Sequence, residues 1–94
     1  MANHDIVAIG TSAGGVEALL FLAARFSPRF PAAIVVTIHL PSDNRSTLDE
    51  ILTRAGPLPA AFAGDGDELS KGRIFIAPPG RHLLIDGERL ALGS

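Results

Sequence analysis

Two short runs of consecutive apolar residues stand out in the first half of the chain. Residues 6–9 form the first run, which stops at Gly10, and residues 33–38 form the second. Continuous apolar runs of this length, rich in β-branched residues, are typical of strands buried on both faces of a parallel sheet. Between the two runs, apolar residues recur at helical spacing and predict a helix of about three turns: Val16, Leu19, Leu20 and Ala23.

A second helix is predicted over residues 47–55. Ser46 is the expected N-cap, and Asp49, three residues later, completes a capping box. Gly56 followed by Pro57 is a common way for a helix to end.

The last third of the chain has the pattern of short strands and turns. Residues 60–63 and 73–77 predict two strands, and the apolar runs 82–85 and 89–92 flank an Asp-Gly pair at 86–87. Since an Asp-Gly pair between apolar runs is a strong hairpin signal, we expect a C-terminal β-hairpin.

The order of strand, helix and strand, with both strands apolar throughout, indicates a right-handed parallel crossover. The expected fold class is α/β. We expect a three-layer αβα arrangement with a doubly wound, mostly parallel sheet, covered by helices on both faces, only part of which this chain supplies, together with the hairpin.

Length and composition narrow the class further. With 94 residues the chain holds one small domain or a piece of a larger one. The sequence is 47% apolar and 19% charged, which excludes intrinsic disorder. A net charge of -2 with scattered basic residues argues against nucleic-acid binding, and the absence of cysteine excludes disulfides, thiolate metal clusters and a thiol nucleophile.

Targeting signals are not apparent. No Lys or Arg precedes the first apolar run, and Glu17 and three glycines interrupt the stretch 6–24. We therefore expect neither a signal peptide nor a transmembrane segment, and a cytoplasmic protein.

Residues 10–14 read Gly-Thr-Ser-Ala-Gly, a G-x-S-x-G motif between a predicted strand and a predicted helix. In that context a sharp turn exposes the central side chain at the carboxyl edge of the sheet, and the flanking glycines avoid a Cβ clash. Ser12 is therefore a candidate nucleophile, and Thr11, Ala13 and Gly14 are candidate elbow and oxyanion residues, since amides at a helix N-terminus stabilise negative charge.

A serine needs a base, and His39 ends the second predicted strand. Because parallel strands end at the same edge and neighbours lie about 4.8 Å apart, we expect Ser12 and His39 to share one crevice.

No convincing third member of a triad is present. Asp43 follows His39 in a loop, Asp65 and Asp67 lie in a turn, and Asp86 belongs to the hairpin. Asp49 is explained by the capping box.

Structural and non-catalytic interpretations compete with these assignments. A Gly-rich turn between strand and helix is also an anion cradle, and residues 10–15 resemble a dinucleotide fingerprint whose middle glycine is a serine. The alternative function is thus a non-catalytic binding module for an anion or nucleotide. His4 is expected at the surface, His82 is expected to be structural, and the Gly-Asp segment 64–68 is expected to be a turn rather than a calcium loop.

Several segments in the same order resemble the chemoreceptor methylesterase family, the CheB catalytic domain. They are residues 9–15 (IGTSAGG), 17–19 (EAL), 38–41 (IHLP), 64–66 (GDG) and 76–84 (IAPPGRHLL). The resemblance extends over residues 6–92. It implies a protein-glutamate methylesterase that hydrolyses methyl-glutamate esters on receptor helices and also deamidates glutamine there. Ser12 matches the family nucleophile and His39 the family base.

Two family features have no match here. The catalytic aspartate of the family lies in a Gly-Met-Gly-x-Asp-Gly segment downstream, and only residues 1–4 precede the first predicted strand, so no receiver domain is expected. The expected organisation is therefore residues 1–94 as the N-terminal portion of a CheB-type catalytic domain. We expect no cofactor or metal, weak or absent turnover from this chain alone, and self-association through exposed apolar surface.

Overall fold

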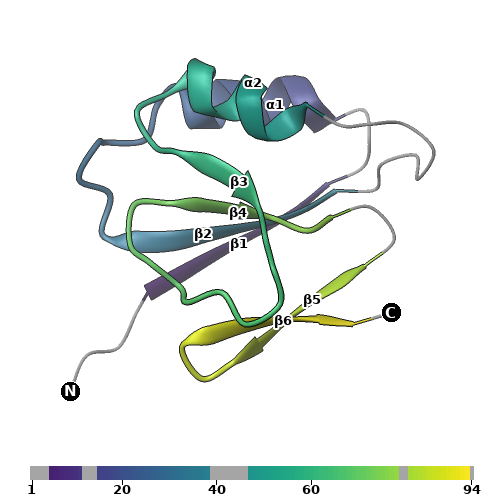
Figure 1. Cartoon of the computed structure of the whole chain (residues 1–94). Coiled ribbons are helices and arrows are strands. Elements are labelled where there is room, and N and C mark those ends of the chain that lie inside the picture. The colour runs from purple at the N-terminus through teal and green to yellow at the C-terminus, as the bar shows by residue number, and fades with distance from the viewer. Residues whose placement is uncertain (1–4, 12–14, 39–46, 79–80, 94) are drawn as a thin grey trace.

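The computed structural model describes residues 5–11, 15–38, 47–78 and 81–93, and the Thr11 side chain is not included (Figure 1). The expected elements are present in the expected order. Their bounds are β1 Asp5–Thr11, α1 Val16–Ala23, β2 Ala32–Ile38, α2 Leu48–Ala55, β3 Ala60–Phe62, β4 Ile74–Ile76, β5 His82–Asp86 and β6 Arg89–Gly93.

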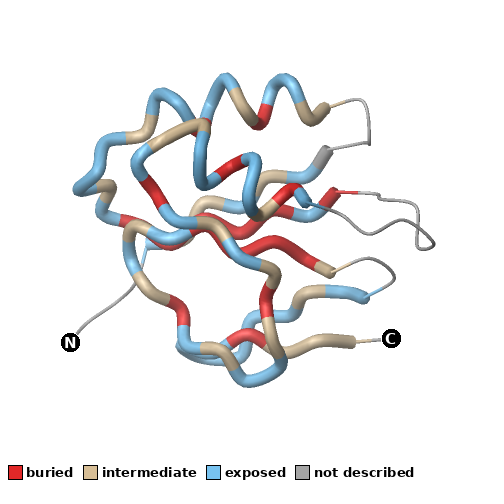
Figure 2. Tube along the Cα trace, turned by 45° about the horizontal axis from the view of Figure 1, so that its top comes forward, coloured by how far each residue is buried: buried red, intermediate tan, exposed pale blue. Residues whose placement is uncertain are grey.

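Four strands form one parallel sheet in the order β1-β2-β4-β3. β2 is central, and its residues 32–36 are all buried, which explains its uninterrupted apolar run. Buried positions also follow β4 through the middle of the molecule (Figure 2). The buried middle of the sheet is thus β2, one of the two outstanding apolar runs, together with β4. The other run, in β1, is only partly buried, so the expected burial of this strand on both faces is not found among the described strands.

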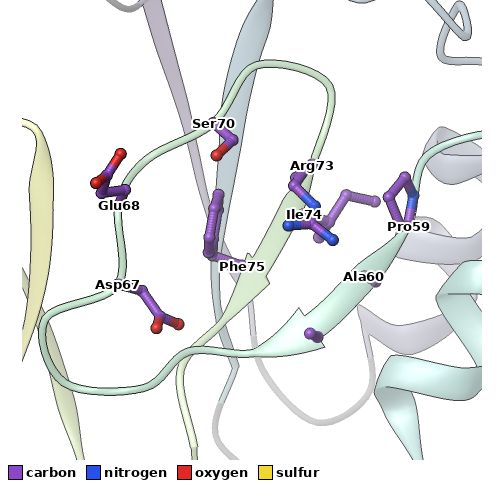
Figure 3. A pocket seen from close by; sticks show the side chains of 9 residues that line it. Pro59, Ala60, Asp67, Glu68, Ser70, Arg73, Ile74 and Phe75 are labelled. Atoms are coloured by element: carbon purple, nitrogen blue, oxygen red, sulfur yellow. The ribbon is translucent and has the colours of Figure 1, made fainter.

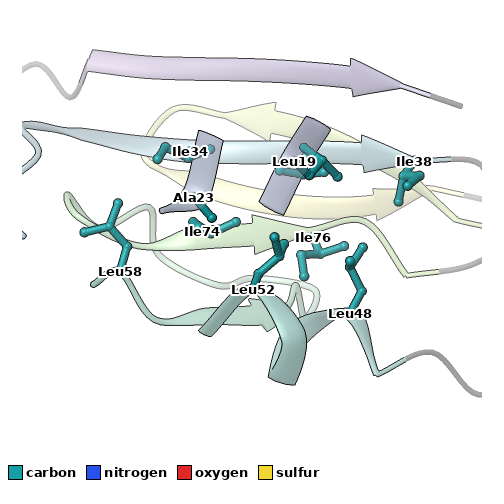
Figure 4. Packing of buried hydrophobic residues seen from close by; sticks show 10 residues of the cluster. Leu19, Ala23, Ile34, Ile38, Leu48, Leu52, Leu58, Ile74 and Ile76 are labelled. Atoms are coloured by element: carbon teal, nitrogen blue, oxygen red, sulfur yellow. The ribbon is translucent and has the colours of Figure 1, made fainter. Parts of the chain in front are cut away.

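Both helices lie on the same face of this sheet (Figure 1). The crossovers from β1 to β2 and from β2 to β3 step in the same direction across the sheet, and right-handed crossovers that do so put their helices on one face. The helix-side core, between the helices and the sheet, contains ten buried residues (Figure 4): Leu19, Ala23, Ile34, Val36, Ile38, Leu48, Leu52, Leu58, Ile74 and Ile76.

The opposite face of the sheet carries a second cluster, the hairpin-side core. The connection from β3 back to β4 steps in the reverse direction, and it contributes Ala63 and Leu69 to this face. Leu90 of the hairpin packs there with Ala33, Val35 and Phe75, which come from β2 and β4. The α/β class, the mostly parallel sheet and the C-terminal hairpin are confirmed. Within the described residues, the hairpin and residues 63–69 occupy the face where a second helix layer was expected.

The hairpin is closed by a two-residue turn at Gly87 and Glu88, because Asp86 is already paired with Arg89. Gly87 has a φ of 65°, the left-handed region that favours glycine, and this requirement is typical of the first position in such a turn. The turn is therefore one residue further along than the Asp-Gly pair suggested.

A short segment, residues 63–69, holds the hairpin against the sheet and is called the clasp below. The Gly66 N–H donates to the Leu90 carbonyl at 2.7 Å, and the Leu90 N–H donates to the Asp67 carbonyl at 2.7 Å. The Asp65 carboxylate accepts from the Leu92 N–H at 2.9 Å. The Gly-Asp-rich sequence of the clasp thus serves as a structural turn that bonds the hairpin backbone.

Some element ends differ from the sequence expectation. Thr47, not Ser46, occupies the N-cap position of α2 and makes no side-chain capping bond. Ser46, the other member of the expected capping box, lies outside the described residues. α1 has eight residues, shorter than expected. β1 continues past Gly10 to Thr11, because both residues remain paired with β2.

Candidate active site

The carboxyl ends of β1 and β2 lie side by side. The two strands pair in parallel through seven positions, and the last pair joins Thr11 to Ile38. Neighbouring parallel strands are about 4.8 Å apart. Ser12 and His39 directly follow this last pair in the sequence, and both lie outside the described residues.

Gly10 is the one glycine of the G-x-S-x-G motif that the structure describes. It pairs with Thr37, and a Cβ built on it would lie 3.4 Å from the Thr37 hydroxyl, an ordinary contact. The expected Cβ clash at this glycine is therefore wrong, because Gly10 belongs to the strand and not to the turn. Ala13 and Gly14 lie outside the described residues.

The helix side of the motif begins at Gly15. This residue occupies the N-cap position of α1 with φ -88° and ψ 7°, and no side chain caps the first turn. The first amides of a helix have no partner within it and favour negative charge nearby. Glu17 lies in this first turn, where the helix dipole favours an acidic side chain.

A third strand end reaches the same edge. β4 pairs with β2 through Val36 and Ile76, and the Ala77 N–H donates to the Val36 carbonyl at 2.9 Å. The segment after β4 therefore begins at the edge of the sheet where β1 and β2 end. Figure 1 shows that all three strands point to that side.

Arg81, which the sequence analysis did not single out, ties this segment to the hairpin. Its Nε donates to the Gly93 carbonyl at 3.0 Å and its Nη2 to the Leu92 carbonyl at 3.3 Å. His82 pairs with Gly93 in the hairpin and is exposed, in keeping with a structural residue of β5. Arg81 directly precedes β5, and no local pattern in the sequence indicates its carbonyl partners in β6.

The described carboxylates that were weighed as a third catalytic member have structural partners or positions. Asp65 binds the Leu92 amide, and Asp67 accepts from the Gly64 N–H at 2.7 Å. Asp86 is the last residue of β5, and Asp49 lies in the first turn of α2. Asp43 lies outside the described residues. Among the described residues, no group of three or more His, Asp or Glu side chains is arranged to hold a metal ion.

A separate hollow of about 320 Å³ opens near the amino ends of β3 and β4 (Figure 3). Phe75 and Ala61 line it together with Asp67, Glu68, Ser70 and Arg73. Because Arg73 directly precedes β4, this hollow lies at the strand beginnings, away from the edge that Ser12 and His39 follow.

These observations define an α/β protein in which a G-x-S-x-G sequence joins β1 to α1 and a histidine follows the neighbouring strand β2 in the sequence. The comparison with known families is more specific. The model of the CheB methylesterase family matches residues 7–94, and the chain therefore belongs to that family.

Curated relatives agree with this assignment. The chain is 40% identical over 82 residues to protein-glutamate methylesterase/protein-glutamine glutaminase 3 of Geobacter sulfurreducens, covering 87% of this chain and 22% of that protein. It is 39% identical over 89 residues to protein-glutamate methylesterase/protein-glutamine glutaminase of Treponema denticola, covering 95% of this chain and 24% of that protein.

The fold is also that of a solved family member. The crystal structure of the Thermotoga maritima CheB methylesterase catalytic domain matches with a TM-score of 0.80 and 29% identity, over 98% of this chain and 50% of that one. The chain thus spans half of that domain and less than a quarter of the length of these two curated relatives. In the described residues, neither helix is long and apolar enough to cross a membrane.

Proposed function

We propose that this chain carries the nucleophile and the general base of a protein-glutamate methylesterase site. Ser12 is the nucleophile, His39 is the base, backbone amides near Ala13 and Gly14 bind the oxyanion, and Thr11 belongs to the elbow. The register of β1 and β2 carries the proposal. The last residue pair of the two strands, Thr11 with Ile38, comes one residue before Ser12 and one residue before His39. This register favours a hydroxyl and an imidazole that face the same crevice.

The chemistry follows from these roles. His39 takes the Ser12 proton as the serine oxygen attacks the ester carbonyl, and the backbone amides stabilise the negative oxygen of the tetrahedral intermediate. The C–O bond to methoxide breaks, methanol leaves with the proton from His39, and an acyl-enzyme remains. Water, deprotonated by His39, then attacks the acyl-enzyme and releases glutamate and free Ser12.

The names of the relatives suggest the substrate. They describe methylesterases and glutaminases that act on protein glutamate and glutamine. We accordingly propose methyl-glutamate on cytoplasmic chemoreceptor helices as the substrate, with deamidation of glutamine as a second reaction at the same site. Both reactions break an acyl bond at a carbonyl of the same side-chain length, so one crevice can serve both.

Labelling with a serine-reactive fluorescent phosphonate tests the two roles. We expect covalent labelling of the natural sequence and none of the Ser12→Ala variant. His39→Ala should lower the labelling rate by about 100-fold or more, because the serine then lacks its base. Ser70→Ala is a matched control, since Ser70 lines the hollow near the strand beginnings.

Two results would contradict the proposal. Labelling that survives in Ser12→Ala would remove Ser12 from the role of nucleophile. Absence of labelling, together with a higher melting temperature on addition of phosphate or a nucleotide, would favour the alternative of an anion-binding module.

A further inference from the structure

The hollow of about 320 Å³ near the amino ends of β3 and β4 is lined by one stretch of the chain. All of its lining residues fall between positions 59 and 75, on β3, on the clasp, on β4 and in the residues that join them. β3 is the edge of the sheet opposite β1, and neither β1 nor β2 contributes to the lining. The volume lies at the lower end of the range for small-ligand sites, roughly 300 to 1,000 Å³. This stretch therefore forms a hollow with room for a small molecule.

Opposite charges stand on opposite sides of the hollow. Figure 3 shows the Asp67 and Glu68 carboxylates on one side and the Arg73 guanidinium on the other. The Phe75 ring and the Ser70 hydroxyl lie between the two sides (Figure 3). The hollow thus offers two negative charges, one positive charge, a hydroxyl and an apolar surface.

The charged groups of the hollow keep bonding capacity that the fold does not use. The Asp67 carboxylate accepts from the Gly64 N–H through Oδ2, and no described residue donates to its Oδ1. Likewise, none of the described residues forms an ion pair or a hydrogen bond with the Arg73 guanidinium. Glu68 pairs with Arg89 at 3.4 Å, but its side chain is 71% exposed, and exposed pairs of this kind are weak. A ligand can therefore bond these groups without breaking a strong contact.

We propose that the hollow binds a basic α-amino acid, with arginine preferred over lysine. The α-carboxylate pairs with the Arg73 guanidinium, which can hold a carboxylate through two parallel hydrogen bonds. The α-ammonium donates to the Ser70 hydroxyl, and the methylene chain crosses the Phe75 ring. The side-chain cation lies between Asp67 and Glu68. A guanidinium suits that position better than an ammonium, because its planar array of donors can bond two carboxylates at once.

The balance of charges favours this ligand over simpler ones. Arginine carries two positive charges and one negative charge at neutral pH, which is the reverse of the charges that line the hollow. A simple anion such as phosphate would pair with Arg73 but would be repelled by the two carboxylates. A polyamine would leave Arg73 facing a like charge. Both signs of charge in one ligand, several bonds apart, are needed to satisfy the two sides.

This site is independent of the proposed esterase roles. The hollow lies at the strand beginnings, whereas Ser12 and His39 follow the strand ends. The Ser12→Ala variant should therefore bind arginine as the natural sequence does. Loss of one proposal leaves the other in place.

Titration of the ¹⁵N-labelled 94-residue chain with L-arginine, followed by NMR, tests the proposal. We expect a dissociation constant on the order of 1 mM, as for a small ligand in an open site. The amide signals of Ala61, Ser70 and Phe75 should shift, and that of Gly87 in the hairpin turn should not. Citrulline, which lacks the side-chain cation, and agmatine, which lacks the carboxylate, should each bind at least tenfold more weakly.

Two variants connect each charge of the ligand to its partner. Arg73→Gln should bind arginine at least tenfold more weakly and should no longer distinguish it from agmatine, because the partner of the carboxylate is gone. Asp67→Asn should narrow the difference between arginine and citrulline. Lys71→Gln is the matched control, since Lys71 is an exposed basic residue close to Arg73 that does not line the hollow. A variant that failed to fold would bind none of the three ligands, and its amide spectrum would collapse.

Three results would overturn the proposal. The first is the absence of shifts at Ala61, Ser70 and Phe75 up to about 20 mM arginine, well above the expected dissociation constant. The second is equal binding of arginine, citrulline and agmatine. The third is an Arg73→Gln variant that binds arginine as tightly as the Lys71→Gln control.

Discussion

Gly56, at the end of α2, lies against the backbone at the end of α1. A Cβ built at this position would lie 1.8 Å from the carbonyl oxygen of Ala23 and 2.5 Å from its carbonyl carbon. Both contacts are with the backbone of α1, which cannot rotate away as a side chain could. Gly56 is also extended, with φ -152° and ψ -176°, so space rather than a left-handed conformation requires glycine here.

We predict that Gly56→Ala lowers the free energy of unfolding by about 3 kcal/mol, because α1 and α2 must separate to admit the methyl group. Gly93→Ala is the control, since the nearest atoms to its Cβ would lie 3.7 Å away, and it should change stability by less than about 1 kcal/mol. Urea unfolding followed by circular dichroism measures both. Equal stability of the two variants would contradict this account of the helix contact.

At the scale of single residues, local patterns in the sequence supply the candidate catalytic groups but not the long-range packing contacts. The G-x-S-x-G motif and His39 could be assigned from local patterns, and the strand register supports their proximity. Gly56 was read as a helix stop, and its contact with Ala23 was missed because the two residues are far apart in the chain. Arg81 was missed for the same reason, since its partners are the carbonyls of Leu92 and Gly93.

Among the elements, the hairpin has the least local support and depends on what it packs against. β5 pairs only with β6 among the described strands, and an isolated two-stranded hairpin is marginally stable. Leu90, 1% exposed, inserts into the hairpin-side core, and the clasp bonds the hairpin backbone around it.

Leu90→Ala should therefore lower the free energy of unfolding by about 3 kcal/mol, the usual cost of a buried cavity. Ile85 is paired with Leu90 across the hairpin but is 48% exposed, so Ile85→Ala should cost less than about 1 kcal/mol. Limited proteolysis adds an element-specific readout, because loss of Leu90 should open the hairpin to cleavage. Identical urea midpoints and cleavage rates for the two variants would show that the hairpin does not depend on this contact.

The edge of β3 supports a second prediction about elements. Thr53→Val keeps the shape of the side chain and removes the hydroxyl that bonds Asp49 and Ala60. We expect a loss of about 1 kcal/mol, close to the net worth of one hydrogen bond. Faster amide exchange of Ala60, measured by NMR, should accompany the loss; unchanged exchange would mean that Thr53 does not protect this edge.

The hairpin and the two helices could be predicted from sequence because their signals are local: a turn dipeptide and helical spacing. The face of the sheet that each would cover could not be predicted. That outcome depends on the order β1-β2-β4-β3, in which β4 inserts between β2 and β3. The insertion is a pairing between distant segments, and it moves the clasp, with the hairpin bonded to it, onto the face opposite the helices.

For the whole molecule, the central point is that the chain offers two proposed catalytic groups and no convincing carboxylate to orient the histidine. Asp65 and Asp67 are bonded to backbone amides of the clasp and hairpin. In the serine-protease template, loss of the orienting acid lowers turnover by about 10⁴-fold.

We accordingly predict that the 94-residue chain hydrolyses a methyl-glutamate peptide roughly 10⁴-fold more slowly than a longer relative such as the Thermotoga maritima catalytic domain. Methanol release under identical conditions is the measurement, with Ser12→Ala as the blank. Turnover equal to that of the longer domain would mean that another group orients His39.

Cysteine cross-linking tests the central claim, the proximity of positions 12 and 39, most directly, because the chain contains no cysteine of its own. A spacing of about 4.8 Å between neighbouring strands lies within the roughly 4.4 to 6.8 Å between Cα atoms that a disulfide spans. The double variant Ser12→Cys/His39→Cys should therefore form an intramolecular disulfide on mild oxidation, seen by mass spectrometry. The pair Ser12→Cys/Ser70→Cys, with one thiol near the strand beginnings, should stay reduced. Failure of the 12–39 pair to oxidise faster than the 12–70 pair would contradict the account.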